Sequence, residues 1–312
     1  MRRRRREDPA FPRLGPEESF PFPDPRSADQ SGIVCSGGNL SPGLLLSAYS
    51  QGIFPWFSDN EPLLWWSPDP RFVLFPGRLH VSDTMRKLMR RFQAGKLPPG
   101  SAAAAEALCG PAEEAATADS TMAALGGAGA AAPAAAAPSP GGAPPALPGL
   151  ELSLDRDFPA VIRACSGARR PGQRGTWITE DMIEAYIELH ELGYAHSAEA
   201  RLGGVLVGGL YGVSLGSVFF GESMFSLVPD ASKAAFIPLV LRLREEGFTL
   251  VDSQVYTDHL AGLGAEEIPR EEYLRLLAAA LAAPTRRGDW SSLFPGFPAS
   301  AEYRRLVPEV RP

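Results

Sequence analysis

The sequence lacks any hydrophobic run long enough to cross a bilayer, because its longest apolar segments fall far short of the ~20 residues that a membrane-spanning helix requires. It also has little cysteine. The three cysteines, Cys35, Cys109 and Cys165, show neither CxxC nor Cys/His spacing, so neither a disulfide framework nor a zinc site is expected. We therefore predict a globular protein of the reducing cytoplasm, without a membrane segment, a bound metal or a cofactor.

Several signatures of common enzyme classes are missing as well. No Gly-x-Ser-x-Gly nucleophile motif and no Gly-x-x-x-x-Gly-Lys phosphate loop occurs. Five arginines open the chain, but Glu7 and Asp8 follow without an apolar stretch, which excludes a secretory signal. We interpret these arginines as a solvated tail, with a phosphate-binding arm as the alternative. Since the net charge is -6, any nucleic-acid contact requires a local basic patch.

Composition divides the chain into five parts. Residues 1–30 are predicted to be a basic, Pro-rich disordered tail, and 95–149 a disordered insertion, because Ala, Gly and Pro dominate there and cannot build a core. The segments 31–94 and 150–283 carry the folding signals, and 284–312 is a C-terminal extension. We predict an α+β protein with a small N-terminal domain and a larger C-terminal domain.

The N-terminal segment combines a helix with crowded aromatic residues. Ser41 and Gly52 bracket the helix, and short strands are predicted around Phe54 and Trp65. Three of the five tryptophans lie within eleven residues. For Trp65 and Trp66 we favour an aromatic core, and for at least one other tryptophan a platform on which a base could stack.

A basic helix follows this aromatic region. Its four cations occupy positions i, i+1, i+4 and i+5, which places them on one side of a helix. This makes it the best phosphate-binding candidate in the chain, with a solvated helix face as the alternative. The four residues are Arg86, Lys87, Arg90 and Arg91.

The C-terminal segment predicts a helix, a three-strand antiparallel meander, a helix, a strand and a last helix, an order that suggests an acyltransferase-like α+β domain. Thr179 caps the first of these helices, and Pro238 predicts a kink or broken turn in the second. A short strand (152–154) and a helix (158–165) precede this series. Its members are 180–192, 196–201, 205–213, 217–221, 231–246, 249–254 and a helix from Pro269.

Polar residues stand at places where this pattern predicts core. Glu222 follows an apolar strand, and Asp252 and Gln254 interrupt another. A carboxylate at a buried strand end is costly unless it has a partner, so these are candidates for chemistry. The alternative is that Glu222 pairs with Lys233 and that Asp252 caps a loop. The histidines His80, His190 and His196 are interpreted as packing or surface residues.

Five motifs together resemble one family, the bacterial leucyl/phenylalanyl-tRNA protein transferases. They cover parts of 31–94 and 150–283 and occur in the family's order. The motifs are Gly52–Phe57 (GIFPWF), Leu64–Arg71 (LWWSPDPR), Gly175–Thr179 (GTWIT), Gly221–Ser226 (GESMFS), and Asp252–Gln254 (DSQ) with Asp258 and His259.

This resemblance implies a small N-terminal domain beside a C-terminal domain of the GNAT acyltransferase type. It implies transfer of Leu or Phe from Leu-tRNA or Phe-tRNA to the N-terminal Arg or Lys of an acceptor protein, which marks that protein for degradation in the N-degron pathway. Gln254 would contact the attacking amine, Asp252 would orient Gln254, and Glu222 would hold the donor amino group.

The same resemblance assigns Trp56 and Trp177 to stacking on the terminal adenosine of tRNA, and the basic helix to the acceptor stem. It also assigns an apolar pocket for the donor side chain to Leu210, Phe219, Met224 and Phe236. Leu210 and Phe236 differ from the family pattern, as does Ser253, and the first two would shrink the pocket in favour of Leu.

Two other functions remain as alternatives. An acetyl-CoA-dependent N-acetyltransferase should carry a glycine-containing pyrophosphate loop before the second helix of the domain, and residues 222–230 contain none. A non-catalytic tRNA-binding module would need the aromatic and basic residues but not Glu222, Asp252 and Gln254 together.

Overall fold

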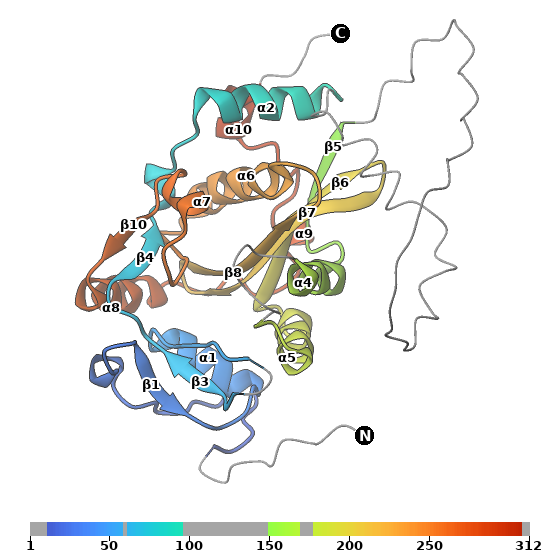
Figure 1. Ribbon diagram of the computed structural model, residues 1–312. Coiled ribbons are helices and arrows are strands. Elements are labelled where there is room, and N and C mark those ends of the chain that lie inside the picture. The colour runs from blue at the N-terminus through green and yellow to red at the C-terminus, as the bar shows by residue number, and fades with distance from the viewer. Residues whose placement is uncertain (1–10, 59–60, 96–148, 169–176, 308–312) are drawn as a thin grey trace, which may run out of the picture.

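The computed structural model describes residues 11–58, 61–95, 149–168 and 177–307. The expected insertion lies almost entirely outside these residues, as do the first ten residues of the tail. Residues 11–30, also predicted to be disordered, instead pack on the fold, since Phe22 is 7% exposed and its backbone N–H donates to Gln51 Oε1 at 3.1 Å. The described chain is a mixed α/β structure with a small sheet near the N-terminus and a larger one that most of the remaining elements cover (Figure 1).

The small unit is a three-stranded antiparallel sheet packed on one helix. Its strands, in the order β1-β3-β2, are β1 (Ile33–Ser36), β3 (Leu64–Trp66) and β2 (Phe54–Pro55). Helix α1 (Pro42–Ser50) begins after Ser41, as predicted, and η1 (Pro25–Ser27) precedes the sheet. Gly52 follows this helix with φ +79°, a left-handed conformation that favours glycine, and an added Cβ would also force the Leu274 side chain, 2.6 Å away, to move.

The large sheet has seven strands in the order β10-β4-β9-β8-β7-β6-β5. All its pairs are antiparallel except β8 with β9, and α6 (Ala231–Glu245) makes the crossover between these two. Because β4 and α2 (Asp83–Gln93) belong to this unit, the small sheet takes up only part of the segment 31–94. The strands are β10 (Glu266–Ile268), β4 (Arg71–Leu74), β9 (Leu250–Asp252), β8 (Val218–Ser226), β7 (Val205–Leu215), β6 (Ala195–Leu202) and β5 (Leu150–Leu154).

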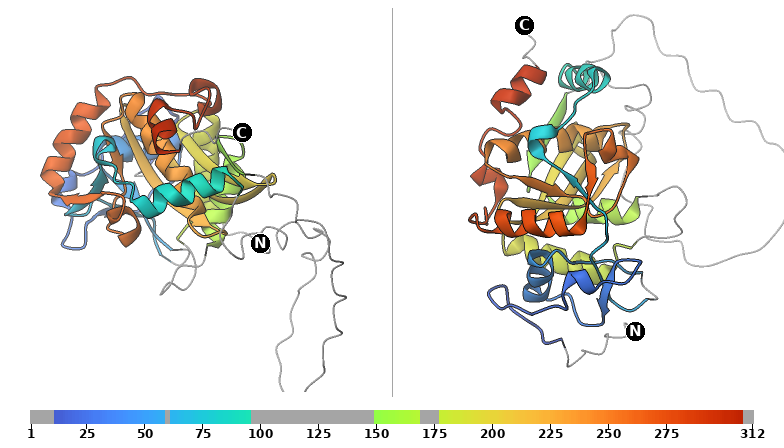
Figure 2. Two further views of the ribbon diagram at one scale, coloured as in Figure 1. Left: turned by 90° about the horizontal axis from the view of Figure 1, so that it is seen from above. Right: turned by 90° about the vertical axis from the view of Figure 1, so that its left-hand side faces the viewer.

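Each face of the large sheet is covered by its own set of helices (Figure 2). The first buried cluster joins the sheet to α1, α4 (Phe158–Gly167), α5 (Glu180–Glu191) and α8 (Arg270–Leu281). The second joins it to α2, α6, α7 (Asp258–Ala261), α9 (Trp290–Leu293) and α10 (Ala301–Leu306). The short η2 (Pro76–Arg78) connects β4 to α2.

Two strand ends differ from the prediction. Strand β8 was expected to end at Gly221, but it continues to Ser226, so Glu222 lies inside it. Strand β9 was expected to run to Gln254, but it ends at Asp252. Helix α6 runs without interruption through Pro238, where a kink or broken turn was predicted.

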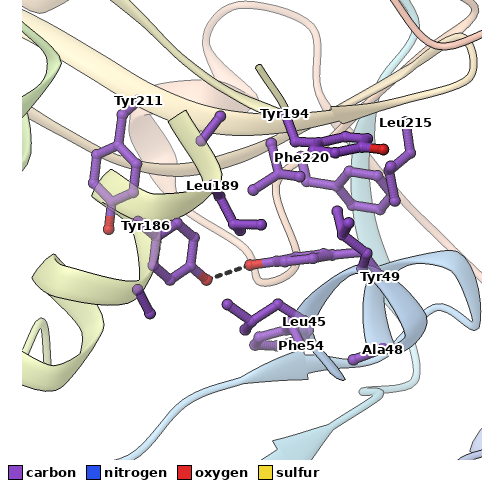
Figure 3. Close-up of a cluster of buried hydrophobic side chains, with 14 of the residues drawn as sticks. Leu45, Ala48, Tyr49, Phe54, Tyr186, Leu189, Tyr194, Tyr211, Leu215 and Phe220 are labelled. Carbon is purple, nitrogen blue, oxygen red and sulfur yellow. Dashed lines mark hydrogen bonds between the residues drawn. The ribbon is translucent and has the colours of Figure 1, made fainter. Parts of the chain in front are cut away.

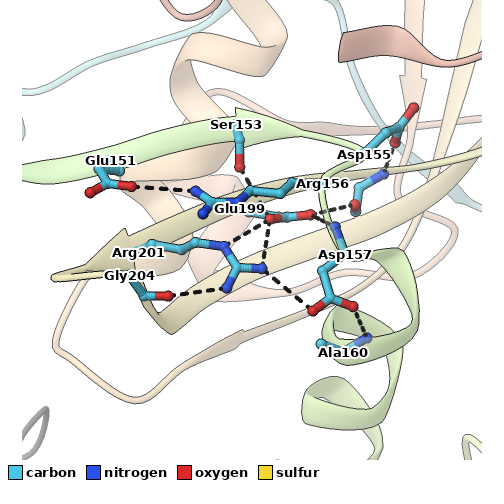
Figure 4. A network of polar contacts seen from close by, with 10 residues as sticks. Glu151, Ser153, Asp155, Arg156, Asp157, Ala160, Glu199, Arg201 and Gly204 are labelled. Carbon is cyan, nitrogen blue, oxygen red and sulfur yellow. Dashed lines mark hydrogen bonds and ion pairs between the residues drawn. The ribbon is translucent and has the colours of Figure 1, made fainter. Parts of the chain in front are cut away.

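A buried polar network links β6 to the edge strand β5 and to the start of α4 (Figure 4). Glu199 of β6 is fully buried and accepts hydrogen bonds from Ser153 Oγ (3.1 Å) and from the backbone N–H of Asp157 (2.6 Å). Arg201 donates two further bonds to it, of 3.2 and 3.0 Å. The charge of Glu199 is therefore paired, as a buried carboxylate requires.

The C-terminal segment, expected to be an extension, is part of the core. Trp290 is fully buried, and its ring stacks on His196 with centroids 3.8 Å apart. Asp155 accepts from the Trp290 backbone N–H (2.9 Å) and contacts His196 Nδ1 (2.8 Å). Burial lowers the pKa of His196 below its usual value. His196 is therefore a packing residue, as predicted, and so is His190, which stacks on Phe158.

Replacing Trp290 tests whether the C-terminal segment holds the fold together. Trp290→Ala should lower the free energy of unfolding by about 3 to 5 kcal/mol, because it leaves a cavity beside His196. Chemical denaturation followed by circular dichroism measures this change. The control Leu293→Ala, at a side chain in the same helix with 45% exposure, should change it by less than about 1 kcal/mol. Equal effects of the two substitutions would contradict a core role for Trp290.

Candidate active site

A β-bulge in β8 places Glu222. Tyr211 pairs with Ser223 and Gly212 pairs with Gly221, so Glu222 has no partner on β7. The extra residue reverses the alternation of side chains, a device that often redirects a functional group. A Cβ on Gly212 would lie 2.2 Å from the carbonyl oxygen of Phe220, so this close approach requires glycine.

Two tyrosines from other elements hold the Glu222 carboxylate. Tyr49 Oη of α1 lies 2.7 Å from Oε1, and Tyr186 Oη of α5 lies 3.2 Å from Oε2. The two hydroxyls also bond to each other, inside the first buried cluster (Figure 3). Two tyrosine protons cannot supply three hydrogen bonds, whereas a protonated Glu222 provides the third.

The environment of Glu222 favours its neutral form. Burial raises the pKa of Glu222 to about 7, although the hydrogen bonds from Tyr49 and Tyr186 lower it. The pKa values of both tyrosines are raised well above normal, first by burial and then by the nearby Glu222 charge, so both hydroxyls keep their protons. The site therefore holds a carboxylate that gains or loses its proton near neutral pH.

A second carboxylate, Asp252, accepts two hydrogen bonds on each of its oxygens. It accepts hydrogen bonds from Arg71 Nε at 2.9 Å, from Arg71 Nη2 at 2.6 Å and from Tyr273 Oη at 2.7 Å. Arg71 and Asp252 are both fully buried. Burial by itself would lower the pKa of Arg71, but the facing Asp252 and Tyr273 raise it above its usual value. Burial raises the pKa of Tyr273 well above normal, so its hydroxyl remains a donor.

Arg71 also connects the two sheets. Its Nη1 donates to the carbonyl oxygen of Gly52 (3.3 Å), just beyond α1. Its guanidinium lies over the Phe54 ring of the small sheet and over the Tyr273 ring, 4.8 and 4.5 Å from their centroids. One buried cation thus fixes the small unit against the large one.

Gln254 adopts a conformation that its neighbours must enforce. Its φ of +59° is in the left-handed region, which is unfavourable for a residue with a Cβ. Asp252 Oδ1 accepts the Gln254 backbone N–H at 2.9 Å, and Phe72 N–H donates to the Gln254 carbonyl oxygen at 3.2 Å. The Gln254 side chain then reaches Glu222, with Nε2 3.4 Å from Oε1.

The structure therefore brings Glu222, Asp252 and Gln254 together. The alternative pairing of Glu222 with Lys233 is wrong, because Lys233 pairs with Asp230 at 2.9 Å. Asp252 contacts the backbone of Gln254, as the loop-cap alternative expected. Among the residues described, no three His, Cys, Asp or Glu side chains are grouped as a metal site would need, and no helix is long and apolar enough to span a membrane.

Three of the four expected pocket residues belong to the second buried cluster, and the fourth, Met224, packs against it. Leu210 and Met224 are cross-strand partners on β7 and β8, and Phe219 and Phe236 pack in the same cluster. All except Met224 are at most 2% exposed. Their role in binding a donor side chain stays a prediction.

The expected stacking residues lie at the margin of the first cluster. Trp56 and Trp177 are both half-buried, and the Trp56 ring lies 5.3 Å from that of Trp66. Of the two tryptophans predicted to form an aromatic core, Trp65 is fully buried, whereas Trp66 is only half-buried. The basic residues Arg86, Lys87, Arg90 and Arg91 are exposed on α2, at the end of the molecule opposite α1 (Figures 1 and 2).

Sequence reasoning missed four residues that hold the site. Tyr49, Tyr186 and Tyr273 lie on helices where an aromatic residue is typical of ordinary core. Arg71 did carry a signal, because a cation directly before Phe72-Val73-Leu74 stands in a strand that is otherwise apolar.

Comparison with known proteins decides the family. The model described as leucyl/phenylalanyl-tRNA protein transferase matches residues 148–278, and the model of that protein's N-terminal domain matches residues 38–69. This chain belongs to the leucyl/phenylalanyl-tRNA protein transferase family. The first match ends within α8 and includes neither Trp290 nor α10.

Curated relatives in this transferase family cover most of the chain. A leucyl/phenylalanyl-tRNA–protein transferase of Myxococcus xanthus is 45% identical over 279 residues, which are 89% of this chain and 95% of the relative. Relatives of the same name from Anaeromyxobacter sp. strain K and Syntrophus aciditrophicus are 45% identical over 269 and 271 residues. These cover 86% and 87% of this chain, and 91% and 90% of the relatives.

Removing Arg71 should expose how strongly the site depends on it. Arg71→Met leaves Asp252 buried and unpaired, so the free energy of unfolding should fall by about 3 to 5 kcal/mol. The control Arg78→Met removes an exposed ion pair with Glu266 and should cost at most about 1 kcal/mol. Urea denaturation of both variants measures the difference. A loss at Arg71 no larger than at Arg78 would contradict the anchoring role.

Proposed function

We propose that this protein transfers leucine or phenylalanine from Leu-tRNA or Phe-tRNA to the N-terminal Arg or Lys of an acceptor protein, with formation of a peptide bond. Family membership supports an aminoacyltransferase that acts on tRNA and protein. The observation that carries the proposal is the contact between Glu222 and Gln254, which brings a desolvated carboxylate beside a carboxamide.

The reaction requires positioning more than activation. The aminoacyl ester of tRNA is already activated, so its conversion to a peptide bond runs downhill without ATP or a metal. The attacking α-amine has a reference pKa of ~7.7 to 8.0, so part of it is neutral near pH 7. Holding the ester and the amine together therefore supplies much of the rate.

Glu222 would bind the ammonium group of the donor aminoacyl residue. Among the residues that the structure describes, no cation forms an ion pair with its carboxylate, and burial raises its pKa to about 7. A donor ammonium would supply such a cation through a charge-assisted hydrogen bond. Tyr49 and Tyr186 keep the carboxylate oriented for this contact.

Gln254 would orient the attacking amine. Because its Nε2 donates toward Glu222, its carbonyl oxygen is the atom available to accept from the amine. A neutral carboxamide does not retain a proton. Both oxygens of Asp252 already accept two hydrogen bonds each, so we infer that the released proton passes to water or a ribose hydroxyl.

The remaining assignments complete the proposal. Trp56 and Trp177 would stack on the terminal adenosine, and Leu210, Phe219, Met224 and Phe236 would bind the donor side chain. The β8-α6-β9 crossover supports a GNAT-type acyltransferase architecture. We place the reaction in the cytoplasm, within N-degron degradation.

A transfer assay tests the proposed reaction. The protein is mixed with radiolabelled Leu-tRNA and a peptide beginning with Arg, or an otherwise identical peptide beginning with Ala. Label should enter the Arg peptide, and Gln254→Ala should lower the rate about 100-fold or more because the amine loses its orientation. Absence of label from both peptides with the wild-type protein would overturn the proposal.

The raised pKa of Glu222 predicts a pH-dependent KM. Below about pH 7 the protonated side chain cannot pair with a cation, so KM for Leu-tRNA should be higher at pH 6 than at pH 7.5. Glu222→Gln should raise KM and remove this dependence, as measured by initial rates across that range. A wild-type KM that does not vary with pH would contradict the assignment of Glu222.

A further inference from the structure

The C-terminal helix α10 lies directly beside the basic helix α2 (Figures 1 and 2). Tyr303 and Val307 pack in the same buried cluster as Met89 and Phe92 of α2. Arg90 Nε also donates to the carbonyl oxygen of Leu306, at 3.2 Å. The two helices therefore form one surface, although α10 lies beyond residue 278, where the family match ends.

This α2–α10 surface carries six exposed cations. Four are on α2, and α10 adds Arg304 and Arg305 in its last turn. Within the described part of the chain, none of the six forms an ion pair with a carboxylate. The acid of α10, Glu302, is already paired with Arg244, and Asp83 is confined to the first turn of α2. The six are Arg86, Lys87, Arg90, Arg91, Arg304 and Arg305.

The chemistry of the surface fits RNA better than a protein partner. Protein interfaces depend on buried apolar anchors, and no exposed large hydrophobic residue lies on α2 or α10. Phosphate binding needs only cations, and binding of double-helical RNA relies on phosphate contacts and shape. Because the whole chain has a net charge of -6, this local patch would direct a polyanion to one region.

We propose that α10 extends the surface that the resemblance assigns to the acceptor stem, with Arg304 and Arg305 binding phosphates of the duplex part of the donor tRNA that the four cations of α2 do not reach. This inference rests on the proposed function. Because the surface lies at the end of the molecule opposite α1, it meets the duplex rather than the terminal adenosine.

Two donor substrates of different size distinguish binding of the tRNA duplex from the transfer reaction itself. Leu-tRNA carries the duplex, whereas 2′(3′)-O-leucyl-adenosine carries only the reacting end. Arg304→Ala/Arg305→Ala should raise KM for Leu-tRNA about tenfold in 100 mM salt, with kcat unchanged. The slope of log KM against log salt should fall by about 1 to 2. Transfer from leucyl-adenosine should stay at the wild-type rate.

A charge-matched control, Arg13→Ala/Arg275→Ala, removes two exposed arginines elsewhere and should leave both donors unaffected. The proposal is overturned if the α10 variant equals this control with Leu-tRNA, or if it loses activity equally with both donors. If the wild-type protein transfers leucine from neither donor, the proposed function fails. Fluorescence anisotropy with labelled deacylated tRNA then still tests the surface, because the α10 variant alone should bind more weakly.

Discussion

The buried ion pair between Arg71 and Asp252 is the constraint on which the rest of the site depends. Neither charge reaches solvent, so each requires the other, and loss of one would leave an uncompensated charge in the core. The same arginine contacts Gly52 and Phe54 of the small unit, while the same aspartate fixes the backbone of Gln254. The same buried ion pair therefore both docks the small unit on the large one and fixes the position of Gln254.

The two carboxylates of the site occupy opposite environments. Asp252 accepts four hydrogen bonds and has a permanent cationic partner. Glu222 sits at a bulge, held by two neutral hydroxyls, and its pKa is raised to about 7. Such different environments give two chemically similar carboxylates different roles. Asp252 is suited to holding geometry, and Glu222 to receiving a charged substrate group.

Local signals predicted much of the fold, because they depend on neighbours in sequence. Thr179 caps α5, and the meander follows from alternating strands separated by glycine turns. Glu222 and Asp252 were identified because a carboxylate in an apolar strand is costly. The bulge could not be predicted, because it depends on how β8 registers against β7. Tyr49, Tyr186 and Arg71 acquire their roles only when distant elements meet.

A crystal structure with an unreactive, amide-linked leucyl-adenosine would test the central claim most directly. We expect the ligand's ammonium group to lie within hydrogen-bond distance of Glu222 and the Gln254 carbonyl oxygen to face the space beside the acyl carbon. Asp252 should remain paired with Arg71 in that complex. A ligand that binds away from Glu222, or an Asp252 that leaves Arg71 to contact the ligand, would contradict it.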